Sequence, residues 1–281
     1  SKHIKDLEDE LGLELFIRKG KRLLGLTEPG QELAHVVDRM LMDARNIKSI
    51  AAQFSARDHG QLTIATTHTQ ARYALPQVVT RFKQEFPKVH LVLHQASPTE
   101  IVTMLQDGRA DIGIATESIA SVSDCVSFQY YGWHHSVIVP AGHPLESVEP
   151  LTLEAIAEHP IITYHEGFTG RTRIDETFAS AGLAPDIVMS ALDADVIKAY
   201  VELGLGIGIV ASMAYDPARD QALRMLPSSH LFGENVTRIA VRKGHFLRGF
   251  AYRFIELCSP ALTEAVVRSA LRPESEMESA Y

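Results

Sequence analysis

The chain has 281 residues, of which 46% are hydrophobic and 22% charged, and these proportions indicate a globular protein with a substantial core. Its length exceeds that of one ordinary domain and predicts two or three compact units. The longest apolar runs, such as residues 207–210, are far too short to cross a bilayer, so we expect no membrane partner. The formal net charge of −8 argues against nucleic acid for the chain taken as a whole.

The cysteines and the amino-terminal residues bear on the cellular compartment. No secretory segment opens the chain, and Cys125 and Cys258 are isolated rather than spaced like metal ligands. Both observations favour a cytoplasmic protein, and the cysteine spacing also argues against structural zinc.

The first two dozen residues are basic although the chain is acidic. Residues 1–11 have the apolar spacing of a helix, residues 13–17 alternate apolar and acidic, and a basic turn leads back into residues 23–26. A helix followed by a hairpin with a basic tip is the layout of a winged helix, whose helix enters the major groove while the tip contacts phosphate. The alternative is a solvated basic loop. The expected DNA contacts are Ser1, Lys2, Lys5, Arg18, Lys19, Lys21 and Arg22.

A long amphipathic helix follows, from Pro29 to about Gly60. Leu33, Met40, Ile47 and Phe54 recur every seven residues along it. Such a stripe usually packs against its own domain, whereas a seven-residue repeat favours a partner helix. The pattern alone leaves both interpretations open.

From residue 61 onward, short apolar strands alternate with amphipathic helices, which predicts mostly parallel sheets covered by helices. Two such α/β units, joined by two crossings near residues 130–133 and 232–236, would enclose a cleft that holds a ligand. The predicted strands cover residues 62–65, 89–94, 110–115, 136–139, 161–163, 187–190, 207–211 and 237–241, and the predicted helices cover residues 71–85, 98–107, 152–157, 172–181, 195–203 and 248–257.

The stretch THTQARYALP, residues 67–76, lies where the strand 62–65 turns into the next helix. The first N–H groups of a helix have no intrahelical partner, and together with hydroxyl side chains they form a ready anion site. The alternative is that Thr67 or Thr69 acts only as a helix N-cap.

Several enzyme signatures are missing from the sequence. The glycines 204, 206 and 208 are spaced GxGxG between a helix and a strand, so they do not form a dinucleotide-binding turn. There is no phosphate-binding GxxxxGK[ST], no GxSxG and no HExxH, and the pair His134–His135 lacks metal-ligand spacing. We expect no catalytic residue, no cofactor and no metal.

The stretch SKHIKDLEDELGLELFIRKGKRLLGLTEPG resembles the second half of the winged helix-turn-helix domain of LysR-type transcriptional regulators. The family spacing is held by Ser1, Ile4, Leu7, Glu8, Leu11, Gly12, Leu15, Phe16, Arg18, Thr27 and Gly30. The chain has no initiating Met and starts inside the would-be recognition helix. The resemblance therefore implies a shortened form whose own DNA binding is weak or absent.

The body is similar to the LysR-type effector-binding domain through GRADIGIA (108–115) and LGLGIGIV (203–210), a fold like that of periplasmic binding proteins. ATTHTQARYALP, GFTGR and DADVIKAYVELGLGIGI resemble the sulfur-assimilation regulators of CysB and Cbl type. That resemblance implies an effector or anion site of Thr67, Thr69, Gln70, Thr116 and Thr169, and its place at a predicted crossing adds Trp133 as a candidate. The resemblance also implies self-association through the linker helix, as a homodimer or homotetramer. The other implied partners are promoter DNA and a small anionic effector, such as sulfate, thiosulfate, O-acetylserine, N-acetylserine or adenosine phosphosulfate.

Other residues near this site have two interpretations. Trp133 either lines the cleft or packs at a crossing, since indoles serve both roles. Arg171 either reaches an anion or pairs at the surface. Asp193 and Asp195 precede a helix, so capping by one of them is the leading explanation, and binding the amine of an amino-acid-like effector is the alternative.

These expectations combine into an α/β fold with two Rossmann-like effector-binding subdomains, preceded by a partial winged helix-turn-helix and a long linker helix. The expected boundaries are the winged segment 1–28, the linker helix 29–59, subdomain I at 60–131 and 236–262, subdomain II at 132–235, and a tail at 263–281, whose acidic end from Pro273 we expect to be disordered. The leading function is a transcription regulator of cysteine-biosynthesis or sulfonate-sulfur genes. The alternatives are a solute-binding protein for sulfate or another small oxyanion and, last, an α/β enzyme.

Overall fold

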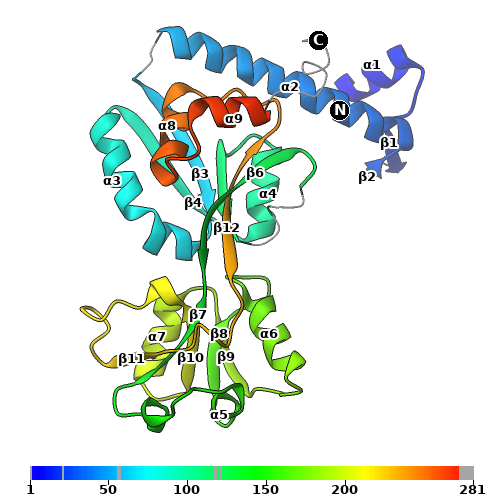
Figure 1. The fold of residues 1–281 in the computed structure, drawn as a ribbon. Helices are drawn as coiled ribbons and strands as arrows, with labels where there is room; N and C mark the ends of the chain where they lie inside the picture. The colour runs from blue at the N-terminus through cyan, green and yellow to red at the C-terminus, as the bar shows by residue number, and fades with distance from the viewer. Residues whose placement is uncertain (1, 21, 56–57, 117–118, 120–121, 272–281) are drawn as a thin grey trace, which may run out of the picture.

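The computed structural model describes residues 2–20, 22–55, 58–116, 119 and 122–271, and it consists of a winged end, a long helix and two α/β lobes (Figure 1). The helices are α1 (Lys2–Leu11), α2 (Glu28–Ser55), α3 (Pro76–Glu85), α4 (Pro98–Gln106), α5 (Leu153–Ala157), α6 (Arg171–Ser180), α7 (Ala194–Glu202), α8 (Gly249–Cys258) and α9 (Glu264–Leu271). The strands are β1 (Phe16–Lys19), β2 (Arg22–Leu26), β3 (Gly60–Thr66), β4 (Val89–Gln95), β5 (Ile112–Ala115), β6 (Cys125–Trp133), β7 (His135–Pro140), β8 (Ile161–Tyr164), β9 (Ile187–Ala191), β10 (Ile207–Ala211), β11 (Leu223–Leu226) and β12 (Asn235–Arg242). Within this part of the chain, no helix is long and apolar enough to span a membrane.

The winged end is helix α1 followed by the antiparallel hairpin β1–β2, as its residue pattern predicts. Glu8 joins the two parts: its carboxylate accepts the backbone N–H of Leu15 at 2.9 Å and pairs with the Arg18 guanidinium. The backbone hydrogen bond to Leu15 is the main cause that holds the pKa of Glu8 below its ordinary value.

Helix α2 contacts lobe I through polar side chains and leaves its apolar stripe outside. Asn46 donates to the Gly244 carbonyl at 2.7 Å and accepts from the Phe246 N–H at 2.9 Å. About two turns further along, Gln53 accepts from the Gly249 N–H at 3.1 Å. Three residues of the seven-residue stripe, Met40, Ile47 and Phe54, are exposed, most of all Phe54 at 85%, and Leu33 is half-buried.

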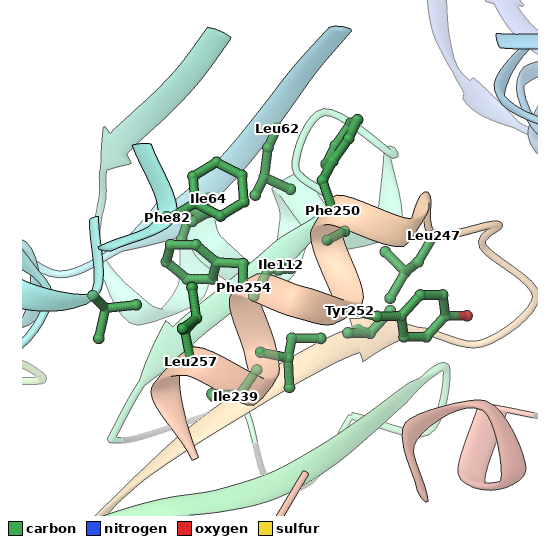
Figure 2. Close-up of a cluster of buried hydrophobic side chains, with 14 of the residues drawn as sticks. Leu62, Ile64, Phe82, Ile112, Ile239, Leu247, Phe250, Tyr252, Phe254 and Leu257 are labelled. Carbon is green, nitrogen blue, oxygen red and sulfur yellow. The ribbon is translucent and has the colours of Figure 1, made fainter. Parts of the chain in front are cut away.

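Lobe I is the sheet β4-β3-β5-β12-β6, with α3, α8 and α9 on one face and α4 on the other. Alternation along each strand divides its side chains between the two faces. Ile64 and Ile112, for example, face the core under α8, where Phe82 and Phe254 pack edge-to-face with centroids 5.4 Å apart (Figure 2).

Lobe II is the sheet β11-β7-β10-β8-β9, with α5 and α6 over one core and α7 over the other. Glycines in two Ile-Gly-Ile stretches, 112–114 and 207–209, allow close helix packing in both lobes. A Cβ on Gly113 would lie 2.7 Å from Leu105 of α4, and a Cβ on Gly208 would lie 3.0 Å from Val201 of α7. Gly208 of the GxGxG stretch therefore has a packing role.

Strands β6 and β12 connect the lobes (Figure 1). They pair antiparallel from Cys125↔Arg242 to Trp133↔Asn235, and β6 leads directly into β7 of lobe II. Both sheets are consequently mixed: β12 runs antiparallel to β5, and β7 runs antiparallel to β10 and β11. The expected parallel pairs are confined to β4-β3-β5 and β10-β8-β9.

Four elements differ from the expectation. The helix predicted over 71–85 is divided into a π-helical turn, Gln70–Ala74, and α3, because Pro76 has no N–H to continue the hydrogen-bond ladder. Strands β6 and β11 were not predicted. Residues 264–271, which we placed in the tail, form α9, whose Val267 is buried in the core of lobe I. Residues 272–281, including the acidic end expected to be disordered, lie outside the described residues.

Neighbouring valines on α9 test whether this helix belongs to lobe I. Val267 is 0% exposed and Val266 is 46% exposed. Val267→Ala removes buried methyl groups and should lower the free energy of unfolding by about 2 kcal/mol, measured by urea denaturation. Val266→Ala is the matched control and should leave the midpoint nearly unchanged. Equal effects of the two changes would contradict the packing of α9.

Candidate anion-binding cleft

The lobes meet through two threonines from opposite sides of the cleft. Thr69 follows β3 in lobe I, Thr169 precedes α6 in lobe II, and their hydroxyl oxygens lie 3.3 Å apart. Both side chains are buried. Thr67 is also buried at the carboxyl end of β3, and its hydroxyl makes no hydrogen bond to another described residue.

Thr237 on β12 is the centre of a second polar group, which we call the Thr237 cluster and which comprises Gln70, Thr116, Trp133 and Thr237. The Thr237 hydroxyl oxygen accepts from Gln70 Nε2 at 3.3 Å and from Trp133 Nε1 at 3.0 Å. It also lies 3.3 Å from the Thr116 hydroxyl. The cluster therefore joins three predicted site residues that are far apart in the sequence.

Hydrogen counting shows that Thr237 is also a donor in this cluster. An amide NH₂ and an indole N–H only donate, so both lone pairs of the Thr237 oxygen are occupied. Its own hydrogen is then donated to the hydroxyl of Thr116 or of Tyr131, both of which bond Thr237.

Tyr131 completes the orientation of Gln70. The Tyr131 hydroxyl donates to Gln70 Oε1, so the amide turns its NH₂ toward Thr237. Burial raises the pKa of Tyr131 to about 12, which keeps this donor protonated at neutral pH. Trp133 thus lies at the crossing and also belongs to the cluster, so both roles weighed for it are compatible.

The turn that presents Thr169 has a backbone conformation that non-glycine residues rarely adopt. Its φ is +45°, and the next residue, Gly170, has φ +71°. His135 Nε2 lies 2.8 Å from the Thr169 carbonyl oxygen, and Asn235 Nδ2 lies 3.3 Å from His135 Nδ1. Because a carbonyl only accepts, His135 donates from Nε2 and accepts at Nδ1, which is the neutral form.

The environment of His135 maintains that neutral form. Burial lowers the pKa of His135 to about 4, and the nearby Arg173 charge acts in the same direction against the opposing effect of the Thr169 hydrogen bond. A Cβ on Gly170 would lie 2.7 Å from the His135 ring, so glycine is required beside it. The turn and the imidazole therefore hold each other in place.

A third contact between the lobes lies at the π-helical turn. The Tyr73 hydroxyl donates to Asp195 at 2.7 Å, and Arg72 Nε donates to the same carboxylate at 3.2 Å. Lys198 approaches it to 3.4 Å and forms a buried pair with Asp220 at 3.1 Å. The partial burial and the carboxylate of Asp195 raise the pKa of Tyr73 above its ordinary range, so it remains a donor.

Other predicted residues have structural partners. Asp193 caps α7 by accepting from the Val196 N–H at 2.9 Å, which confirms the leading explanation. Arg171 is buried and donates to the Tyr164 carbonyl at 2.7 Å and to Asp175 at 2.8 Å, so it stabilises the start of α6 rather than reaching the cleft.

A group with metal-ligand chemistry lies beside this contact. His68, Asp193 and Asp195 have donor atoms within 4.8 Å of one another. Asp195 is already bound by Arg72 and Lys198, and these cations compete with a metal ion for its charge. The group therefore fits a contact between the lobes better than a metal site.

The residues predicted to contact DNA lie on the surface of the winged end. Lys2, Lys5, Lys19 and Arg22 are exposed, whereas the Arg18 guanidinium is bound by Glu8. Ser1 and Lys21 lie outside the described residues.

Sequence reasoning missed Thr237, Tyr131, His135 and Tyr73. Thr237 and Tyr131 lie on the two crossing strands, and His135 begins β7 directly after β6; none of these three belongs to a recognisable motif. Their location could have identified them, because polar side chains at predicted crossings between two lobes are candidates for a shared cleft.

The comparisons with known proteins agree with this architecture. Residues 55–263 match the LysR substrate binding domain. The HTH-type transcriptional regulator SsuR of Burkholderia cenocepacia is 57% identical over 272 residues, which are 97% of this chain and 88% of the relative. CysB of the same organism is 50% identical over 276 residues, covering 98% and 88% of the two chains, and cbl of Escherichia coli is 49% identical over 281 residues, covering 100% and 89%.

The solved structures agree on the fold. The crystal structure of the cofactor-binding domain of the Cbl regulator matches with a TM-score of 0.73 at 49% identity, over 76% of this chain and 95% of that domain. HinK of Pseudomonas aeruginosa, a LysR family regulator, covers 94% of this chain and 88% of its own, with a TM-score of 0.65 at 21% identity. The fold and the cleft define a two-lobed small-molecule-binding protein with a winged end. The chain belongs to the LysR family of transcriptional regulators.

The buried His135 predicts a pH dependence of stability. Its folded pKa of about 4 lies below the ordinary value of 6.5, so between these values the unfolded chain binds a proton that the folded chain does not. Stability should therefore fall as pH falls from 6.5 toward 4, by on the order of 3 kcal/mol for this group alone.

Denaturant unfolding between pH 7 and pH 4.5 measures this contribution. His135→Gln keeps an amide donor for the Thr169 carbonyl but has no titrating group, so its stability should fall less steeply than that of the wild type. His134→Gln changes the half-buried neighbour and should follow the wild type. A His135→Gln variant with the full acid slope would show that another group causes it.

Proposed function

We propose that this chain regulates the transcription of sulfur-assimilation genes, for cysteine biosynthesis or for use of sulfonate sulfur. It binds promoter DNA through its winged end and senses a small anion in the cleft. The observation that carries the effector site is the convergence of Thr69, Gln70, Thr116, Trp133 and Thr169 on one junction between the lobes. Membership of the LysR family and the relatives named above support the regulatory role.

The donors of the cleft suit an oxyanion. Threonine hydroxyls and the second N–H of the Gln70 amide donate to negatively charged oxygen, and such charge-assisted hydrogen bonds are stronger than neutral ones. Thr67 adds a buried hydroxyl that has no acceptor among the described residues. Sulfate, thiosulfate, O-acetylserine, N-acetylserine and adenosine phosphosulfate all carry an acceptor group that fits this chemistry.

Binding an anion changes the contact between the lobes. The Thr69 and Thr169 hydroxyls now bond each other, so an anion placed between them must replace that bond and alter their separation. A ligand shifts an assembly only by binding its arrangements with different affinities. The bonds from Tyr73 and Arg72 to Asp195 limit how far the lobes open.

Strand β12 gives this change a route to the linker helix. Asn235 and Thr237 at its beginning belong to the cleft, and the loop after its end, at Gly244 and Phe246, holds Asn46 of α2. A strand paired on both sides moves as a rigid unit, and so we propose that lobe motion reorients α2 and the winged end attached to it.

Self-association of α2 is part of the proposal. Its polar side contacts lobe I, whereas Met40, Ile47 and Phe54 are 65%, 67% and 85% exposed. An apolar stripe of this period needs a partner helix, and a second copy of α2 supplies one in a homodimer or homotetramer.

The remaining assignments follow from that role. A regulator of promoter DNA works in the cytoplasm. Because the relatives are transcriptional regulators, we assign the cleft a sensing role without catalysis. A solute-binding protein for oxyanions has a similar two-lobed cleft, but the winged hairpin and the exposed stripe of α2 have no purpose in it.

The proposal is tested in the full-length protein. We expect it to bind promoter DNA in a salt-dependent way, and sulfate or another of the named effectors should change the affinity or the pattern of the complex in a gel shift. Thr69→Val should keep DNA binding and weaken the response to the anion about tenfold or more, because it removes a hydrogen bond to a charged group.

Thr80→Val is the matched control, since the Thr80 hydroxyl is exposed on α3 and bonds only the Pro76 carbonyl of its own helix. It should behave like the wild type. A full-length protein without salt-sensitive DNA binding would refute the regulatory function, and a Thr69→Val response equal to that of Thr80→Val would place the effector elsewhere.

A further inference from the structure

A hollow of about 370 Å³ lies immediately beside the cleft, between α6 and the beginning of β12. It shares Thr116 with the Thr237 cluster, so its inner wall is also a wall of the candidate anion site. The charged side chains that line it are Arg173, Glu176, Glu234 and Arg238.

The two arginines of this hollow form no ion pair with another described residue. Neither Arg173 nor Arg238 forms an ion pair within 4.0 Å of any carboxylate in the described part of the chain, although two glutamates border the same hollow. Arg238 is half-buried on β12, where an unpaired charge costs more than at an open surface. A ligand with an acidic group would relieve that cost.

The side chains around the hollow also differ in direction. Arg173 packs over Gly233, where an added Cβ would meet its Nη1 at 2.7 Å, and its charge lowers the pKa of the inward-lying His135. The Glu234 carboxylate instead packs against Gly132 of β6, and Glu176 is exposed, as Arg173 is. Of the four charged side chains, Arg238 is the one that is half-buried, so its unpaired guanidinium gains most from an acidic ligand that extends outward from Thr116.

We propose that this hollow binds a second acidic group of the effector. The preferred effector is then a molecule with two acidic groups joined by a short spacer, one held in the cleft and the other by Arg173 and Arg238. A bare oxyanion occupies only the inner part. This inference rests on the proposed effector site and adds the chemical class of the ligand.

Three probes with the same carbon chain separate the alternatives. Propane-1-sulfonate has one acidic group, 3-sulfopropanoate adds a carboxylate, and homotaurine adds an ammonium group instead. The affinity of each can be titrated through the fluorescence of Trp133, the only tryptophan of the chain, whose indole N–H bonds Thr237. The two-carbon series of ethanesulfonate, sulfoacetate and taurine tests the spacer length.

We expect the sulfonate-carboxylate of one of the two series to bind about tenfold or more tightly than its matched alkylsulfonate, the gain of a charge-assisted hydrogen bond. Arg173→Gln and Arg238→Gln should each reduce that preference while leaving the alkylsulfonate affinity unchanged. Arg109→Gln, at an exposed arginine paired with Asp107 outside the hollow, is the control and should retain the preference.

Two results would overturn the second subsite and leave the cleft intact. One is equal binding of the dianion and the alkylsulfonate in both series. The other is tightest binding of the aminosulfonate, together with loss of that preference in Glu234→Gln. That result would show that the subsite binds a cationic group of the ligand. If sulfate and all sulfonates leave the fluorescence unchanged and do not affect DNA binding, the effector site itself is wrong.

Discussion

The two antiparallel strands β6 and β12 are the constraint on which the site depends, because they connect the lobes and also carry cleft residues. Trp133 ends β6, Thr237 lies near the beginning of β12, and the indole of the first donates to the hydroxyl of the second at 3.0 Å. A change in the angle between the lobes therefore changes the site directly. By the same coupling, the anion of the proposed function would act on the lobe geometry when it binds there.

The same strands explain why the buried polar groups are tolerated. Gln70, Thr237 and Tyr131 satisfy one another, and His135 is satisfied between Thr169 and Asn235. A buried network of this kind is stable only when every member has a partner. Each bond also fixes a donor direction within the network.

Much of this arrangement was accessible from the sequence, for identifiable reasons. Periodicity placed most helices and strands, and the threonines at the strand end 62–65 and in the GFTGR turn marked the two sides of the cleft. The pattern did not reveal β6 or the role of Thr237, because a crossing strand is half-exposed and its polar contacts are made by residues about 100 positions away. The π-helical turn at Gln70–Ala74 also had no local signal beyond Pro76.

The most direct test of the central claim is to locate a bound oxyanion. Crystals of the protein soaked in selenate, which has the shape and charge of sulfate, allow the selenium to be placed by its anomalous scattering. The account predicts a selenium peak within hydrogen-bonding reach of the Thr69, Thr116 and Thr169 hydroxyls. Selenium bound only at the basic surface of the winged end, with the cleft unoccupied at saturating selenate, would contradict it.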